Sequence, residues 1–107
     1  MNGNHVILRK ERLEHIRERH PEVVDLIKEK YKEILENPNY ILKDKQYLDS
    51  VWFIKKLENS NINIILKLSL KNKIKHKGLE NSIITAYGMS NKQLKRYVNK
   101  LEKLLTK

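Results

Sequence analysis

The sequence predicts an α+β fold in which N-terminal helices pack on a four-stranded antiparallel β-sheet and a closing C-terminal helix follows. Apolar residues recur at helical spacing through residue 35, alternate singly from residue 40, and return to helical spacing after residue 90. The chain has 107 residues, of which 39% are hydrophobic. We therefore expect one domain over residues 1–107 with a core of its own.

The first third of the chain is expected to hold a short strand and two helices. Residues 5–8 are a candidate strand, and residues 10–19 form a helix with Ile16 on its buried side. Pro21 disfavours helix at the preceding residue but suits the first position of a new helix. The second helix has an apolar set at helical spacing, consisting of Val23, Val24, Ile27, Tyr31, Ile34 and Leu35.

Four strands are expected after this helical region, at residues 40–43, 50–58, 62–70 and 82–87. In the third strand, every second residue is apolar, and three of the positions between them are polar. The apolar residues are Ile62, Ile64, Leu66, Leu68 and Leu70, and the polar ones are Asn63, Lys67 and Ser69. This alternation predicts an antiparallel strand that is buried on one face only.

A capping box marks the start of the last helix. Ser90 followed by Gln93 allows each side chain to bond the backbone N–H of the other residue. The helix is expected to continue to residue 105, because apolar residues keep helical spacing that far. Its apolar stripe consists of Leu94, Tyr97, Val98, Leu101, Leu104 and Leu105.

The net charge of +10 points to a polyanionic partner. Residues 1–39 hold eight Lys or Arg and eight Asp or Glu, whereas residues 40–107 hold fifteen against five. The excess charge therefore lies entirely in the last two thirds. The chain has no Cys, no apolar run of the roughly 20 residues that span a bilayer, and no recognisable leader at its N-terminus. We expect a cytoplasmic protein without a membrane partner, although the chain could also end a larger exported toxin.

Two groups of residues are candidates for chemistry. His15 and Arg19 lie four apart on one helix face, and His20 falls at the break between the helices. On the fourth strand, regular alternation would put Thr85 and Tyr87 on the same face as Ile83. The plain alternative is that the helical residues are solvated, that His20 caps the next helix, and that Thr and Tyr only reflect strand propensity.

The lysines of the sheet region form a third candidate group, for binding RNA. Lys56 and Lys67 lie on two strands that are expected to pair. A loop of alternating lysines follows and would attract phosphates irrespective of sequence, although such charge runs are often only solvated. These loop residues are Lys71, Lys73, Lys75 and Lys77.

Several other chemistries lack a motif in this chain. There is no glycine-rich phosphate-binding motif, and the four histidines and the carboxylates show no metal-site spacing. We therefore expect neither a metal nor a cofactor. A nuclease of this kind would rely on acid–base chemistry, which RNA permits because its 2′-hydroxyl is an internal nucleophile.

Three short motifs together resemble a known family. Residues 15–16 and 19–21 read His-Ile and Arg-His-Pro, residues 36–41 read Glu-Asn-Pro-Asn-Tyr-Ile, and residues 83–87 read Ile-Ile-Thr-Ala-Tyr. In this order they resemble the phage-type members of the barnase–EndoU–colicin–RelE-like (BECR) nuclease superfamily. The resemblance implies two helices on a four-stranded antiparallel sheet and metal-independent endoribonuclease activity.

The resemblance also implies a site and its partners. Active sites in this superfamily combine a helical His, basic residues, and a Ser or Thr with an aromatic residue on a late strand. Carried over, these are His15, Arg19 or His20, then Thr85 with Tyr87 beside it. RNA, in particular tRNA, is the implied substrate, and an acidic antitoxin or immunity protein is the implied inhibitor. Two other interpretations stay open: a non-catalytic, basic nucleic-acid-binding phage accessory protein, and a structural domain whose last helix packs on a partner.

Overall fold

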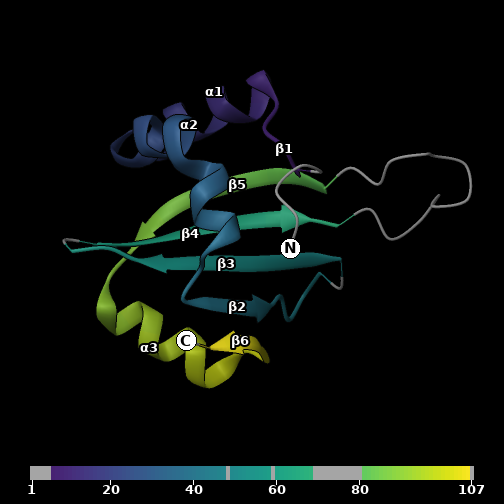
Figure 1. The fold of residues 1–107 in the computed structure, drawn as a ribbon, viewed down its shortest axis with the longest axis vertical. Coiled ribbons are helices and arrows are strands. Elements are labelled where there is room, and N and C mark those ends of the chain that lie inside the picture. Colours follow the sequence, from purple (N-terminus) through teal and green to yellow (C-terminus); the bar gives the residue numbers. More distant parts are fainter. Residues whose placement is uncertain (1–5, 48, 59, 69–80, 107) are drawn as a thin grey trace, which may run out of the picture.

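The computed structural model describes residues 6–47, 49–58, 60–68 and 81–106. These residues form an α+β fold with three helices and one six-stranded sheet (Figure 1). Along the chain the elements are β1 (Val6–Ile7), α1 (Lys10–Arg19), α2 (Pro21–Glu36), β2 (Tyr40–Lys43), β3 (Ser50–Lys56), β4 (Asn61–Lys67), β5 (Asn81–Met89), α3 (Asn91–Lys100) and β6 (Lys103–Thr106).

The two N-terminal helices have the predicted positions. His20 ends α1, and Pro21 opens α2 at the position where its missing N–H costs nothing. Ile16 is fully buried, and the apolar residues of α2 face the sheet. In Figure 1, α2 crosses in front of β5, β4 and β3. The 3.6-residue periodicity therefore predicted both the helices and the side by which they pack.

The sheet is larger than predicted. Its order is β1-β5-β4-β3-β2-β6, and the four expected strands form the antiparallel centre. A short strand at residues 5–8 was expected, but not its parallel pairing with β5, which makes the sheet mixed. At the other edge β6 pairs with β2. The expectation of a purely antiparallel, four-stranded sheet was wrong because both edge strands are too short to show a pattern of alternation.

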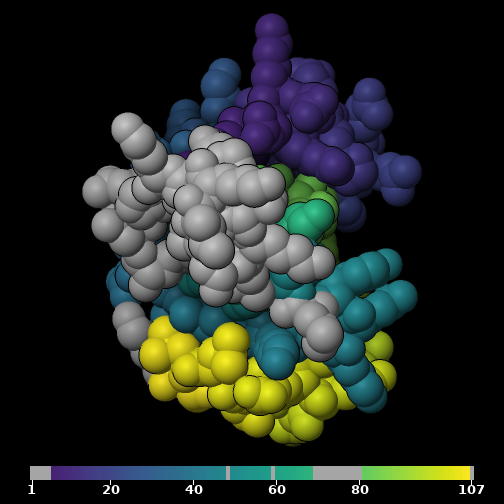
Figure 2. All heavy atoms as spheres, turned by 90° about the vertical axis from the view of Figure 1, so that its right-hand side faces the viewer, coloured from purple at the N-terminus to yellow at the C-terminus, as the bar shows by residue number. Residues whose placement is uncertain are grey.

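Both faces of the sheet are covered, which corrects the prediction that β4 is buried on one face only. The first core lies between the sheet and α1–α2, and includes Ile64 and Leu66. The second core lies under α3, and includes Trp52, Ile54 and Leu94. Figure 2 shows the purple N-terminal residues and the yellow C-terminal residues at opposite ends of the molecule. Because α3 covers part of the second face of the sheet, polar side chains on that face are also buried.

The last helix is shorter than predicted. Both hydrogen bonds of the capping box are present at Ser90 and Gln93, as expected. The helix ends at Lys100, however, because Leu101 takes an extended conformation and the chain continues into β6. Leu104 is consequently 51% exposed and does not extend the helical stripe. The edge of β2 forms backbone hydrogen bonds with β6. These bonds stabilise the extended conformation more than two further leucines at helical spacing would stabilise a longer helix.

A β-bulge changes the faces of β5. Ile65 pairs with Thr85 and Leu66 pairs with Ile83, so Ile84 is an extra residue in the strand. As a result, Ile83 and Ala86 both face the first core, and Ile83 does not share a face with Thr85 as regular alternation predicted. The bulge therefore allows Ile83 and Ala86 to be buried in the first core while Thr85 and Tyr87 face the opposite side of the sheet.

Candidate active site

The candidate site lies on the face of β4 and β5 that looks toward α3. Tyr87 stands on this face, and its ring centroid is 5.5 Å from that of His20, with the planes tilted by 36°. His20 comes from the junction of α1 and α2, which pack against the opposite face. The histidine therefore meets the second face at the β5 side of the sheet, although its helix covers the first.

The conformation of the helix junction leaves the imidazole of His20 available. Its backbone is not helical (φ −139°, ψ 62°), and its side chain makes no capping hydrogen bond to α2. The His20 side chain therefore does not cap the second helix, although the residue stands at its N-cap position. Its Nδ1 lies 3.9 Å from Oε2 of Glu22, and the side chain is 34% exposed.

The hydroxyl of Tyr87 accepts a hydrogen bond from Asn63, which is not one of the predicted site residues. Asn63 is opposite Tyr87 in the β4–β5 ladder, and its Nδ2 donates to Tyr87 Oη at 3.2 Å. Burial raises the pKa of Tyr87; the hydrogen bond from Asn63 opposes the rise, and nearby Tyr97 and Asp44 add to it. The phenol is therefore protonated at neutral pH. Because Asn63 occupies its oxygen as an acceptor, the O–H remains able to donate.

Two buried side-chain oxygens of the described residues have no hydrogen-bond partner, and both belong to this site. They are Asn63 Oδ1 and Thr85 Oγ1. Thr85 is two residues before Tyr87 on the same face, and Tyr87 is the cross-strand partner of Asn63. Leaving a buried polar group unpaired costs about 1–3 kcal/mol, so such groups call for an explanation. Their occurrence together beside Tyr87 indicates a place suited to polar contacts.

An aromatic and acidic cluster borders the site on the α3 side. The rings of Trp52 and Tyr97 meet edge to face at 4.9 Å, and Trp52 Nε1 donates to Asp44 Oδ2 at 2.9 Å. Partial burial acts to raise the pKa of Asp44, but the hydrogen bonds from the Tyr47 N–H, Trp52 and the Gln46 N–H outweigh it and lower the pKa. The Asp44 carboxylate is therefore ionised at neutral pH and fixes the indole of Trp52.

The other helical candidates are farther from this contact. Arg19 is exposed at the end of α1, and His15 is half-buried one turn earlier. Within the described ranges, neither side chain makes a ring contact or an ion pair with the sheet. Of the predicted residues, the structure brings together His20, Tyr87 and Thr85, while Arg19 lies next to His20 in the chain and His15 stands apart.

The predicted lysines do not form one group. Lys56 and Lys67 are on paired strands, as expected, but Lys56 is opposite Asn61 and Lys67 is opposite Ser50. They lie at opposite ends of the hairpin, six ladder positions or roughly 20 Å apart. Lys67 is on the same face as Asn63 and two positions beyond Ile65, the partner of Thr85. Lys71, Lys73, Lys75 and Lys77 lie outside the described residues.

The sequence of the third strand contains a signal that points to Asn63. Asn is disfavoured in strands, and here it interrupts an otherwise apolar segment. The alternation was interpreted as one solvated face, whereas Asn63 is 0% exposed. Among the described residues, no three His, Asp or Glu side chains cluster as a metal site would require, and no helix is long and apolar enough to cross a bilayer.

Comparison with known proteins identifies the family. Residues 1–96 match the family described as phage-Barnase-EndoU-ColicinE5/D-RelE like nuclease3. No curated protein and no solved structure gives a significant match. The match runs from the N-terminus into α3, so it includes every element that contributes to the His20–Tyr87 contact. The chain belongs to this phage-type family of BECR nucleases.

Proposed function

We propose that the protein is a metal-independent endoribonuclease that cleaves RNA by attack of a ribose 2′-hydroxyl on the adjacent phosphate. The contact between His20 and Tyr87 is the observation that carries the proposal. It joins an imidazole to a protonated phenol on a face where Thr85 has a further hydroxyl. Membership of a nuclease family supplies the substrate class, nucleic acid.

In the proposed reaction, His20 accepts the proton of the 2′-hydroxyl as general base. The oxygen attacks phosphorus and the bond to the 5′-oxygen breaks. That oxygen takes a proton from solvent and leaves as the 5′-hydroxyl of one product, and a 2′,3′-cyclic phosphate remains on the other. The exposed Arg19 guanidinium, next to His20 in the chain, and Lys67 on the face of Thr85 stabilise the charge that develops on the phosphoryl oxygens.

Tyr87 and Thr85 complete the arrangement as hydrogen-bond donors. The Tyr87 O–H is free to donate to a phosphoryl oxygen because Asn63 bonds its lone pair. The hydroxyl of Thr85 is buried and has no partner among the described residues. We assign it a substrate phosphate, which reaches it when neighbouring side chains move on binding. Donors placed in advance at the position of developing charge lower the barrier without reorganising during the reaction.

The substrate and the partners are narrower parts of the same proposal. An RNase with these properties would harm its own host, so we include an acidic antitoxin or immunity protein that covers the basic surface. Association with it would be accelerated by electrostatic steering. Within the RNA class, we favour tRNA as the target of a toxin-type enzyme.

Incubation of the purified protein with an RNA strand in excess EDTA tests the proposal. We expect cleavage in EDTA, products that end in a 2′,3′-cyclic phosphate by mass spectrometry, and no cleavage of the same sequence made as DNA. Cleavage that depends on added divalent metal, or that proceeds equally on DNA, would contradict it. Binding of RNA without any cleavage would instead favour a non-catalytic accessory protein.

Replacement of Thr85 by Val should separate stability from activity. Val keeps the branched shape but removes the unpaired buried oxygen, so we expect the free energy of unfolding to be unchanged or to rise by up to about 1 kcal/mol. Loss of a donor to the phosphate should at the same time reduce kcat roughly 10²-fold. Urea denaturation and single-turnover cleavage measure the two effects. Unchanged kcat in a stable Thr85→Val protein would remove this residue from the mechanism.

A further inference from the structure

The exposed side of α3 carries positive charge that no acidic residue of the helix compensates. This helix has four cations and no acidic residue, and no ion pair of the described residues involves it. In contrast, α1 and α2 alternate cations with Glu and Asp, and the ion pairs Arg17–Glu14 and Lys30–Glu33 belong to them. The cations of α3 are Lys92, Lys95, Arg96 and Lys100, all of which are exposed.

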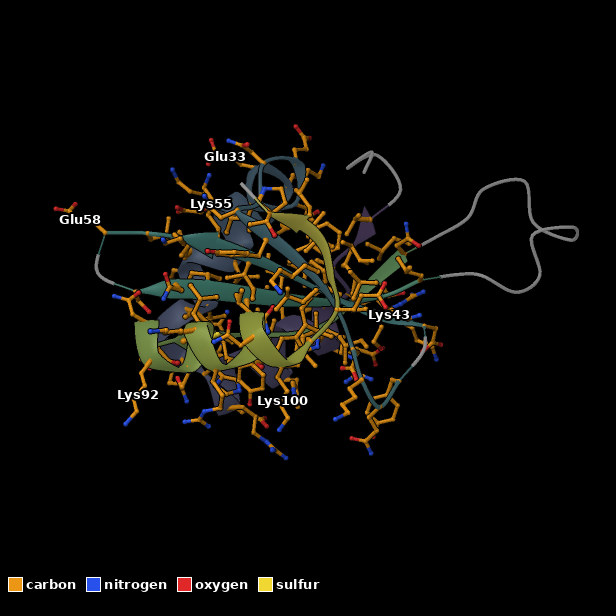
Figure 3. The ribbon with its side chains drawn as sticks, turned by 90° about the horizontal axis from the view of Figure 1, so that it is seen from below. Glu33, Lys43, Lys55, Glu58, Lys92 and Lys100 are labelled. Carbon is orange, nitrogen blue, oxygen red and sulfur yellow. The ribbon has the colours of Figure 1, made fainter. Side chains whose placement is uncertain are left out.

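Three of these cations form a regular row. Lys92, Arg96 and Lys100 follow one another at intervals of four residues, so they lie on one helix face about 6 Å apart along the axis. Figure 3 shows Lys92 and Lys100 pointing away from the sheet on the same side of α3, opposite to the side of Glu33 and Lys55. Like charges at this spacing repel each other, and Lys92 in addition opposes the positive end of the helix. A bound anion would relieve both effects.

The row also stands next to the candidate site. Tyr97 belongs to α3, directly follows Arg96, and packs in the same cluster as Tyr87. The helix begins two residues after the end of β5, the strand that carries Thr85 and Tyr87. A nucleic-acid strand with one phosphate at His20 and Tyr87 can therefore place its neighbouring phosphates along α3.

We propose that Lys92, Arg96 and Lys100 bind the phosphate backbone of an extended RNA strand whose scissile phosphate lies at His20 and Tyr87. The inference rests on the proposed function and makes it more specific: the preferred substrate is a strand of several phosphates, not a dinucleotide. Each cation contacts one phosphate without reading the base.

The test compares the variant Lys92→Gln/Arg96→Gln/Lys100→Gln with a matched control, Lys28→Gln/Lys30→Gln/Lys32→Gln. The control removes three exposed cations from α2, so the net charge of the two proteins changes equally. We expect the α3 variant to lose about tenfold or more in kcat/KM on an extended RNA strand, to keep its kcat/KM on a dinucleotide, and to bind with less salt dependence. Each lost contact lowers the slope of log K against log salt by about 0.7, so from 50 to 200 mM salt the parent should lose about 20-fold more affinity than the variant.

The outcomes distinguish this inference from the proposed function. If the parent cleaves RNA and the α3 variant behaves as the α2 control does, the inference is wrong and the proposed function stands. If the parent cleaves no RNA, the proposed function fails, and the salt dependence of RNA binding still decides whether α3 binds the backbone. Tight binding of the α3 row to an acidic protein but not to RNA would overturn the assignment of RNA as its partner.

Discussion

Replacement of His20 by Ala should reduce RNA cleavage by about 10²–10⁴-fold, because a general base contributes a factor of this size. His20 is the histidine whose ring meets Tyr87, and its side chain has no capping role in the helix junction. The side chain is 34% exposed and belongs to neither hydrophobic core, so the variant should fold. Single-turnover cleavage of an RNA strand at saturating enzyme measures the loss, and circular dichroism with a thermal melt checks the fold.

The corresponding change at His15 discriminates between the two helical histidines. His15 stands farther back on α1 and makes no ring contact or ion pair with the sheet in the described part of the chain. We expect His15→Ala to cleave within a few-fold of the parent. If His15→Ala is the inactive protein and His20→Ala is active, the site has to be rebuilt around the earlier residue. Full activity of both variants would remove histidine from the mechanism.

Replacement of Ile64 by Ala should destabilise the protein by about 2–5 kcal/mol, the usual cost of such a cavity. Ile64 is 0% exposed on β4, between Phe53 of β3 and Ala86 of β5. The total free energy of unfolding of a small domain is about 5–15 kcal/mol. The variant should therefore be partly unfolded at moderate temperature. Urea denaturation gives the free energy of unfolding. The urea concentration at the midpoint should fall, with little change in the dependence of this free energy on urea concentration.

Two further variants calibrate this result. Ile64→Val removes one methylene and should cost only about 0.5–1.5 kcal/mol. Leu104→Ala changes a side chain that is 51% exposed on the edge strand β6 and should stay within about 0.5 kcal/mol of the parent. An Ile64→Ala protein as stable as Leu104→Ala would mean that β4 does not occupy the centre of the sheet.

The regular elements could be predicted because local rules determine them. Pro21 and the capping box at Ser90 marked helix starts to the residue, and the change from helical spacing to alternation marked Tyr40. The rest depended on distant parts of the chain. Whether the segment after Leu101 stays helical depends on the free edge of β2, and the face of Ile83 depends on a bulge that only the pairing with β4 creates. Neither leaves a periodic signal in the sequence.

For the candidate site, the sequence indicates residue types but not their arrangement in space. The resemblance selected His20, Thr85 and Tyr87 but could not choose between His20 and His15, a choice that depends on how the helix junction meets β5. Asn63 was passed over because a polar residue in an alternating strand normally faces water. Its burial follows from the coverage of the second face by α3, which the strand itself does not reveal.

The placement of β6 has a thermodynamic consequence for α3. This helix is continuous with β5 at one end, and at the other it leads into a strand that is hydrogen-bonded to β2. Opening of the β2–β6 ladder would therefore release the C-terminal end of the helix from the sheet. Any polyanion that binds only the docked helix must, by linkage, also disfavour that opening. The backbone amides at this edge should thus exchange more slowly with deuterium when RNA is bound, even though no phosphate touches them.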